Sequence, residues 1–124
     1  MTNRKQILTA SNIKYLLALY ALNSDGSGTR CVRIAEALGI TKPSVHAMID
    51  TLKEMKLVRK DLYGAVSFTD TGRELARKYS KYYEVLCSYL RVLLPDESDV
   101  GSAACALMAE VEPEHLEEMC DRIK

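Results

Sequence analysis

The side chains between residues 41 and 53 combine types that can bind nucleic acid. Lysine and serine donate hydrogen bonds to phosphate oxygens, histidine donates to a base edge or a phosphate, and alanine contacts the methyl group of thymine. The candidate contacts are Thr41, Lys42, Pro43, Ser44, His46, Ala47, Thr51 and Lys53, of which Thr41 and Pro43 set the start of a helix. Arg30, Arg59 and Lys60 are candidates for contacts to the phosphate backbone. The pattern favours a surface that binds double-stranded DNA, and the alternative for each cation is an ordinary solvated charge.

Sulfur ligands form a second candidate site. Cys105 and Met108 are three residues apart, on one face of a predicted helix, and Cys87 lies on the helix expected to face it. Thiolate and thioether groups select copper(I) or zinc, or form a redox-sensitive site. The competing interpretation is a core lined with small and soft side chains. All four cysteines of the chain stand singly, so neither a disulfide framework nor a zinc finger is indicated.

The candidate DNA contacts belong to a helix-turn-helix predicted over residues 32–52. Ala35 is the small residue where the two helices cross, Gly39 supplies a left-handed turn, and Val45 anchors the second helix. Thr41 caps that helix, and Pro43 lies in the first turn, where a missing N–H does no harm. The polar face of the second helix is the face that a recognition helix presents to a major groove.

The remaining elements follow from periodicity and turn chemistry. Apolar residues at helical spacing predict a first helix over residues 10–23. Two short extended runs, 58–60 and 66–68, flank a turn at 61–64 and predict a hairpin wing. A long helix is expected from about residue 69 to the Leu94-Pro95 pair, followed by two further helices. The predicted fold class is mainly α: a winged helix-turn-helix of three helices and a short β-hairpin over 1–70, then a helical dimerisation module over 71–124.

The long helix carries more apolar surface than a short wing can cover. The candidate dimer residues on it are Tyr79, Tyr82, Tyr83, Leu86, Leu90 and Leu93. Tyrosines at this spacing favour a dimer core over a site that stacks on bases or on an aromatic ligand. A homodimer would bury this surface, and a two-fold dimer places two recognition helices about 34 Å apart on a palindromic site.

Charge is segregated along the chain, although the formal net charge is zero. Residues 1–94 carry 15 Lys and Arg against 8 Asp and Glu, and residues 95–124 carry 2 against 9. A basic body suits phosphate contacts, and the alternative is a set of solvated helix faces. A winged helix that binds another protein, with its acidic end docking the partner, is the non-DNA alternative.

Enzymatic and membrane functions find no support in the sequence. It contains no G-x-S-x-G, no H-E-x-x-H, no phosphate-binding glycine run, and no Cys/His or paired-carboxylate pattern at catalytic spacing. No apolar run approaches the ~18 residues of a membrane helix, and the first residues do not form a cleavable leader. We therefore expect a cytoplasmic protein that is not an enzyme.

Three stretches resemble the metal-dependent repressors of the diphtheria-toxin-repressor (DtxR) and manganese-transport-regulator (MntR) type. They are KYLLALYALN at 14–23, RIAEALGITKPSVHAMIDTLKEMKLV at 33–58 and FTDTGRELA at 68–76, and the resemblance covers most of the chain. The length resembles the manganese-sensing branch, which lacks an SH3-like domain. The resemblance implies a homodimeric DNA-binding repressor with Mn or Fe as its cofactor. Winged helices of the multiple-antibiotic-resistance type, which have longer wings, are the second choice.

The ligand positions implied by this resemblance fall mostly on side chains that do not bind Mn or Fe. They fall on Lys14, Leu17, Tyr83, Cys87, Cys105, Met108 and Ala109. Mn and Fe(II) prefer carboxylate and imidazole ligands, so only Cys105 is a plausible survivor. A register shift of one residue would add Glu84 or Glu110. We expect the usual metal sensing to be lost, with a copper, zinc or redox response as the alternative.

Lys14 is a cation at a position that the resemblance assigns to a metal ligand. Its ammonium group would supply a permanent positive charge and pair with Glu84 or Glu110, which would lock the first helix against the helices behind it. The alternative is an exposed lysine on a polar stripe.

Overall fold

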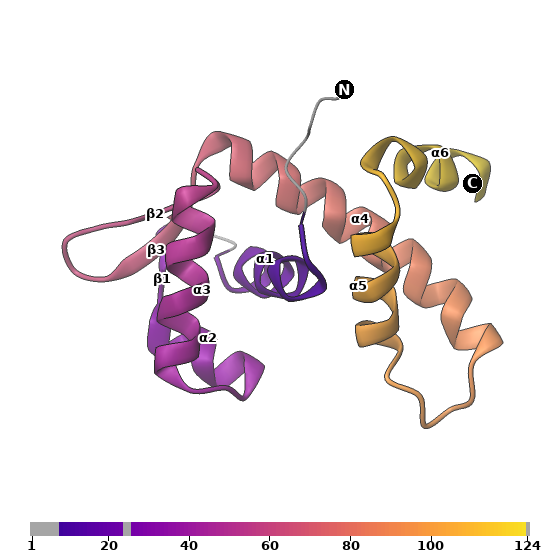
Figure 1. Cartoon of the computed structure of the whole chain (residues 1–124), viewed down its shortest axis with the longest axis horizontal. Coiled ribbons are helices and arrows are strands. Elements are labelled where there is room, and N and C mark those ends of the chain that lie inside the picture. The colour runs from indigo at the N-terminus through magenta and orange to yellow at the C-terminus, as the bar shows by residue number, and fades with distance from the viewer. Residues whose placement is uncertain (1–7, 24–25, 124) are drawn as a thin grey trace. The chain divides into compact units, whose positions relative to one another are not determined.

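The computed structural model of the chain describes residues 8–23 and 26–123. The elements are α1 (Ala10–Leu22), β1 (Thr29–Arg30), α2 (Cys31–Leu38), α3 (Lys42–Glu54), β2 (Val58–Lys60), β3 (Ala65–Phe68), α4 (Asp70–Leu93), α5 (Val100–Glu110) and α6 (Pro113–Ile123) (Figure 1). The chain divides into two compact units, one of which is Tyr15–Arg77. The described residues up to Lys14 and from Lys78 onward form the other. The predicted fold class, a winged helix-turn-helix followed by a helical module, is confirmed.

The helix-turn-helix consists of α2, a glycine turn and α3. Gly39 has φ 67° and donates its N–H to the carbonyl of Ala35, which ends α2 as predicted. Thr41 caps α3 by accepting a hydrogen bond from the Ser44 N–H at 3.3 Å. The core side chains Ile34, Val45, Ile49 and Leu52 are fully buried. Local chemistry thus fixes both the turn and the start of α3.

The wing, residues 58–68, is part of a three-stranded sheet rather than an isolated hairpin. The strand order is β1-β3-β2, and both pairings are antiparallel. Thr29 pairs with Val66, and Val58 pairs with Phe68. The prediction missed β1 because two residues are too short to show an alternating pattern. This third strand gives β3 a partner on each side, which a two-stranded ribbon lacks.

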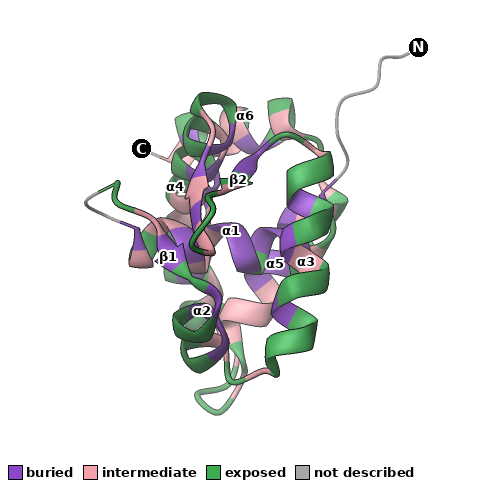
Figure 2. Cartoon of the chain, turned by 90° about the vertical axis from the view of Figure 1, so that its left-hand side faces the viewer, coloured by how far each residue is buried: buried purple, intermediate pink, exposed green. Residues whose placement is uncertain are grey.

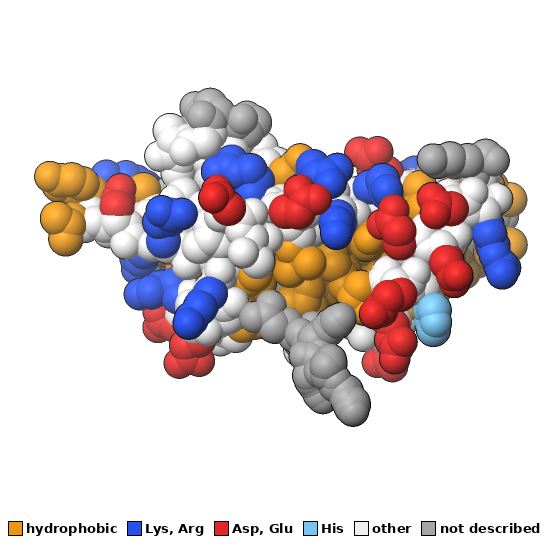
Figure 3. Space-filling model, turned by 90° about the horizontal axis from the view of Figure 1, so that it is seen from above, with side chains coloured by type: hydrophobic (Ala, Val, Ile, Leu, Met, Phe, Trp, Pro, Cys, Tyr) orange, Lys and Arg blue, Asp and Glu red, His pale blue; other side chains and the backbone are white. Residues whose placement is uncertain are grey.

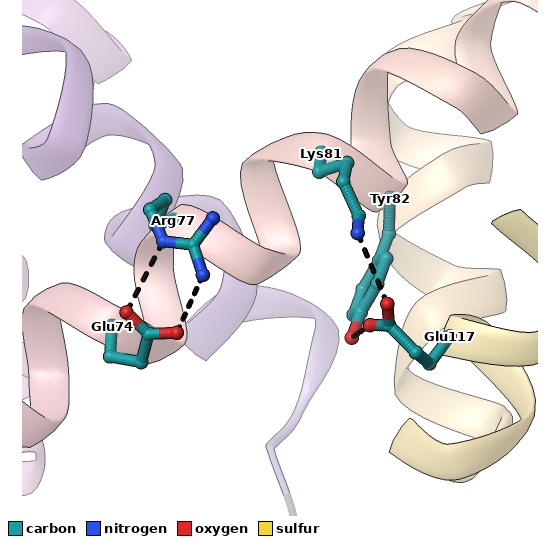
Figure 4. Close-up of polar contacts among 5 residues, drawn as sticks. All are labelled: Glu74, Arg77, Lys81, Tyr82 and Glu117. Atoms are coloured by element: carbon teal, nitrogen blue, oxygen red, sulfur yellow. Dashed lines mark hydrogen bonds and ion pairs between the residues drawn. The ribbon is translucent and has the colours of Figure 1, made fainter. Parts of the chain in front are cut away.

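The start of α4 is anchored on the end of the helix-turn-helix. Thr69 Oγ1 accepts a hydrogen bond from the Gly72 N–H at 3.0 Å and thereby caps the helix. The Thr69 N–H donates to the Leu57 carbonyl at 3.0 Å. Glu74 forms an ion pair with Arg77 at 2.6 Å (Figure 4).

The second unit packs the rest of α4 with α5 and α6. Glu117 of α6 accepts hydrogen bonds from the Tyr82 hydroxyl at 2.7 Å and from Lys81 Nζ at 3.1 Å (Figure 4). Asp99 caps α5 by accepting from the Ser102 N–H at 3.1 Å. The buried apolar side chains of this unit include Tyr79, Leu86, Cys87, Ala104, Cys105, Met108, Leu116 and Cys120. No helix in the described part of the chain is long and apolar enough to cross a membrane.

Candidate nucleic-acid interface and thiol site

The face of α3 away from the core is open to solvent along its length (Figure 2). The candidate contacts Thr41, Lys42, Pro43, Ser44, His46, Ala47, Thr51 and Lys53 are all exposed, whereas Val45, Ile49 and Leu52 face the core. The Thr51 hydroxyl donates to the Ala47 carbonyl at 3.2 Å. Asp50 is exposed on the same helix and would repel a phosphate. The α3 face therefore has the exposure that a groove-binding helix needs.

A contact between α3 and the wing joins two of the predicted contact regions. Lys60 Nζ lies 3.4 Å from His46 Nδ1, and Cys31 Sγ lies 3.9 Å from the same nitrogen. Arg59 is exposed on the wing, and exposed Arg30 donates from Nη1 to the Tyr63 carbonyl at 2.9 Å. Lys60 of the wing thus borders the α3 face.

The turn of the wing presents two apolar side chains that the sequence analysis did not single out. Leu62 is 96% exposed and Tyr63 is 77% exposed. The signal available in the sequence was an apolar pair inside a predicted turn, a place usually filled by polar residues.

The site that the resemblance assigns to a metal has a different polar network. Lys14 Nζ donates to Ser102 Oγ at 3.3 Å, and Ser102 Oγ donates to Asp99 Oδ2 at 2.8 Å. The hydrogen bonds from Ser102 hold the pKa of Asp99 below its ordinary value. Lys14 therefore bonds to α5 through Ser102, and the expected pairing with Glu84 or Glu110 is not the contact found.

The thiols of Cys87 and Cys105 lie in the core next to this network. Burial raises the pKa of the Cys105 thiol, and the Lys14 ammonium lowers it in part. Burial and a hydrogen bond with Cys87 raise the pKa of the Tyr83 hydroxyl, to which the Cys105 thiol also contributes. Met108, the third sulfur candidate, is fully buried. The sulfur atoms of Cys87 in α4 and Cys105 in α5 therefore lie near each other.

Manganese and ferrous iron do not fit these residues. In residues 8–23 and 26–123, no group of three or more His, Cys, Asp or Glu side chains is arranged to hold a metal ion. Hard divalent ions need several oxygen or imidazole ligands, and the positions in question present an ammonium group, a phenol and buried sulfur.

The candidate dimer residues divide into a buried set and an exposed set. Tyr79, Tyr82 and Leu86 are buried within the chain itself, and the Tyr79 and Tyr82 rings meet edge to face at 5.3 Å. Tyr83 and Leu90 are half-buried. Leu93 is 75% exposed, next to Val92 at 83%. The apolar surface still open to a partner lies at the end of α4.

Comparison with known proteins agrees with this organisation. The family described as "Iron dependent repressor, N-terminal DNA binding domain" matches residues 7–66. MntR of Bacillus subtilis is 26% identical over 92 residues, which is 74% of this chain and 65% of that relative. The match therefore spans less than two thirds of the relative's length.

Two solved structures share the fold. The manganese regulator SloR aligns with a TM-score of 0.70 and 22% identity, over 89% of this chain and 53% of that one. IdeR of T. acidophilum aligns with a TM-score of 0.65 and 17% identity, over 99% of this chain and 55% of that one. Residues 7–66 are therefore similar to the DNA-binding domain of iron-dependent repressors, and the two solved structures show that the chain shares the fold of regulators of this type.

Proposed function

We propose that this chain is a homodimeric repressor that binds a palindromic operator without requiring Mn or Fe. The observation that carries the DNA-binding role is the open α3 face with the basic wing held beside it by the His46–Lys60 contact. Lys42, Lys53, Arg30, Arg59 and Lys60 contact phosphates in this proposal. Ser44, His46, Ala47 and Thr51 contact base edges.

The salt dependence of DNA affinity tests this role. Each phosphate contact releases counterions, so the affinity of the protein for a duplex should fall steeply with added salt. A pool of random duplexes, selected by several rounds of binding, should also yield a site with two inverted half-sites. A protein that shows no shift on any duplex at low salt would instead support the protein-binding alternative.

Independence from Mn and Fe is supported by the chemistry of the expected ligand positions. Lys14 stands where the family would place a ligand, and it hydrogen-bonds to Ser102 of α5. A lysine ammonium cannot coordinate a cation and repels it. We infer that the Lys14–Ser102–Asp99 chain provides a permanent link between the start of α1 and α5.

A second candidate function, a copper(I)- or thiol-responsive repressor, is favoured by the shared neighbourhood of Cys87 and Cys105. Two thiolates suit copper(I), whereas a structural zinc ion prefers four ligands. Elemental analysis of the purified protein, combined with a thiol titration, tests it. Copper bound to the wild type in stoichiometric amount, but not to a Cys87→Ser/Cys105→Ser variant, would support this candidate. Four titratable thiols in the unfolded protein, with no bound metal after copper(I) addition, would exclude the metal response.

A further inference from the structure

Cys31, the first residue of α2, contacts the face of α3 that we propose to bind DNA. Its Sγ atom lies 3.9 Å from His46 Nδ1, and Lys60 Nζ of the wing lies 3.4 Å from the same nitrogen. Three elements, α2, α3 and β2, therefore bring a thiol, an imidazole and an ammonium group together. A thiol beside a base and a cation is the arrangement in which a cysteine acts as a nucleophile.

The contacts at His46 leave one hydrogen-bond donor too many. An ammonium group can only donate, so Nδ1 is the acceptor and the neutral ring carries its proton on Nε2. Nδ1 has one lone pair, which the Lys60 ammonium and the Cys31 thiol must share. A sulfur atom that carries an oxygen would instead accept a hydrogen bond from the ammonium. The cluster is therefore better matched to an oxidised cysteine than to the free thiol.

The start of α2 provides further positive potential at this sulfur. Arg30 precedes the helix in an extended conformation and contributes no side-chain cap. The first N–H groups of a helix have no partner within the helix, and their dipoles favour a negative charge. Figure 3 shows several Lys and Arg side chains on the part of the surface that includes the wing. An oxidised, negatively charged sulfur would thus be stabilised by α2 and by β2.

Cys31 is also the most exposed of the four cysteines. Its exposed fraction is 7%, against 2% to 4% for Cys87, Cys105 and Cys120, and the neighbouring His46 is exposed. Hydrogen peroxide is small and needs to reach only the sulfur atom. By contrast, burial raises the pKa of the Cys105 thiol, which disfavours the reactive thiolate there. The exposure and the neighbouring groups therefore single out Cys31 for oxidation.

We propose that hydrogen peroxide oxidises Cys31 and that this oxidation weakens DNA binding. The inference rests on the proposed DNA-binding function. The thiol proton passes to His46 Nδ1 while the sulfur attacks one peroxide oxygen and the O–O bond breaks. The departing hydroxide takes up that proton and leaves as water, so peroxide is reduced and Cys31 is oxidised to a sulfenic acid. The new oxygen then accepts from the Lys60 ammonium, which withdraws Lys60 and His46 from the DNA.

Operator binding before and after a short peroxide treatment tests this switch. The affinity of the wild type for the selected operator should fall about tenfold, as expected for the loss of a charged contact, and dithiothreitol should restore it. The slope of log affinity against log salt should decrease in magnitude by about 0.9, because Lys60 no longer contacts a phosphate. Dimedone, which reacts with sulfenic acids, should label Cys31, as identified by mass spectrometry of tryptic peptides.

Two cysteine variants assign the effect to one site. Cys31→Ser keeps a donor beside His46, so it should bind the operator before treatment and lose no affinity in peroxide. Cys87→Ser/Cys105→Ser should keep the full peroxide response, which separates this switch from the copper or thiol response of those two residues. A peroxide response that is kept in Cys31→Ser and lost in the double variant would overturn the inference.

A change of charge at Lys60 tests the role of the ammonium group. With dimedone in excess, Lys60→Met should slow the labelling of Cys31 about fivefold, the upper value of a partly exposed ion pair. Arg59→Met removes the preceding cation of β2, which points to the other face of the strand, and should leave the labelling rate unchanged.

The remaining outcomes separate this inference from the proposed function. If the wild type binds the operator and dimedone labels Cys31 no faster than Cys87, the inference is overturned while the proposed function stands. The same holds if Cys31 is labelled but the affinity for the operator does not change. If the wild type binds no duplex at any salt concentration, the proposed function fails and the switch fails with it.

Discussion

Gly72, in the first turn of α4, is required by a close backbone approach. A Cβ atom at Gly72 would lie 1.8 Å from the carbonyl oxygen of Leu57. That oxygen also accepts the Thr69 N–H at 3.0 Å, so it cannot move away without losing a hydrogen bond. We expect Gly72→Ala to lower the free energy of unfolding by about 2 to 3 kcal/mol, measured by urea denaturation.

Gly39→Ala is the matched control because its backbone is left-handed but its surroundings are open. Gly39 has φ 67°, and a Cβ atom there meets nothing within 4 Å. Its cost should be the conformational strain alone, about 1 kcal/mol. If Gly72→Ala and Gly39→Ala lower the free energy of unfolding equally, the close approach to Leu57 is not the reason that position 72 requires glycine.

The Tyr82–Glu117 hydrogen bond makes the stability of the second unit sensitive to acid. This bond and the Lys81 ammonium hold the pKa of Glu117 below its ordinary value of 4.5. A carboxyl with a lowered pKa stabilises the fold above its ordinary value, and that stabilisation is lost as the pH falls through the lowered pKa. The free energy of unfolding of the wild type should fall between about pH 5 and about pH 3, and this fall should be smaller in Tyr82→Phe. Urea denaturation at each pH measures it.

The neighbouring Tyr79 supplies the control for this pH dependence. Tyr79 is buried beside Tyr82, and no contact with Glu117 raises its pKa, which is raised by burial alone. Tyr79→Phe should therefore keep the wild-type pH dependence. A Tyr82→Phe protein with an unchanged acid profile would contradict the assignment to Glu117.

Single residues were predictable from the sequence where their chemistry acts locally. The Gly39 turn and the Thr41 cap involve neighbours within four residues, and both are confirmed. The partners of Lys14 and Glu117 lie 88 and 35 residues away, so no local pattern indicates them. Lys14 donates to Ser102 rather than pairing with Glu84 or Glu110, and it is exposed, as in the alternative interpretation of a lysine on a polar stripe.

Among the elements, long periodic helices were predictable and short strands were not. The end of α4 at Leu93 follows from the proline at position 95. Strand β1 has two residues and is defined by its pairing with β3, so it becomes visible only once the wing is in place. The exposure of the wing turn was likewise not predictable from the sequence, because it depends on which residues the other elements cover.

The start of α1 and α5 should stay linked when metal ions are removed. Because Lys14 bonds to Ser102, we expect DNA affinity to be unchanged by EDTA and not to increase with added Mn. Lys14→Met should weaken operator binding by up to about fivefold, the value of one hydrogen bond of about 1 kcal/mol. Fluorescence anisotropy on the selected operator measures both effects.

Lys78→Met is the control for this link, since it removes an exposed lysine of α4. It should leave affinity near that of the wild type. Loss of binding in EDTA and recovery with Mn would refute a permanent link through Lys14.

At the scale of the whole molecule, the end of α4 leaves an apolar surface for a second copy of the chain. Tyr89, Val92 and Leu93 are exposed at positions i, i+3 and i+4 of one helix face. Tyr79, Tyr82 and Leu86 stabilise the protomer, so the dimer interface that we propose is displaced toward the end of the helix. A patch of this kind is covered in a homodimer because water solvates it poorly.

We expect the wild type to sediment at twice its chain mass of 13.9 kDa and Leu93→Asp to sediment at 13.9 kDa. A carboxylate buried against a second copy would lose its hydration without gaining an opposite charge or a hydrogen bond. This free-energy cost shifts the equilibrium to monomers. Leu62→Asp places the same charge on the exposed wing and should leave the dimer intact. Because a monomer engages one half-site, Leu93→Asp should also lose the preference for two inverted half-sites over one. If the Leu93→Asp protein remains dimeric, the dimer interface does not lie at the end of α4.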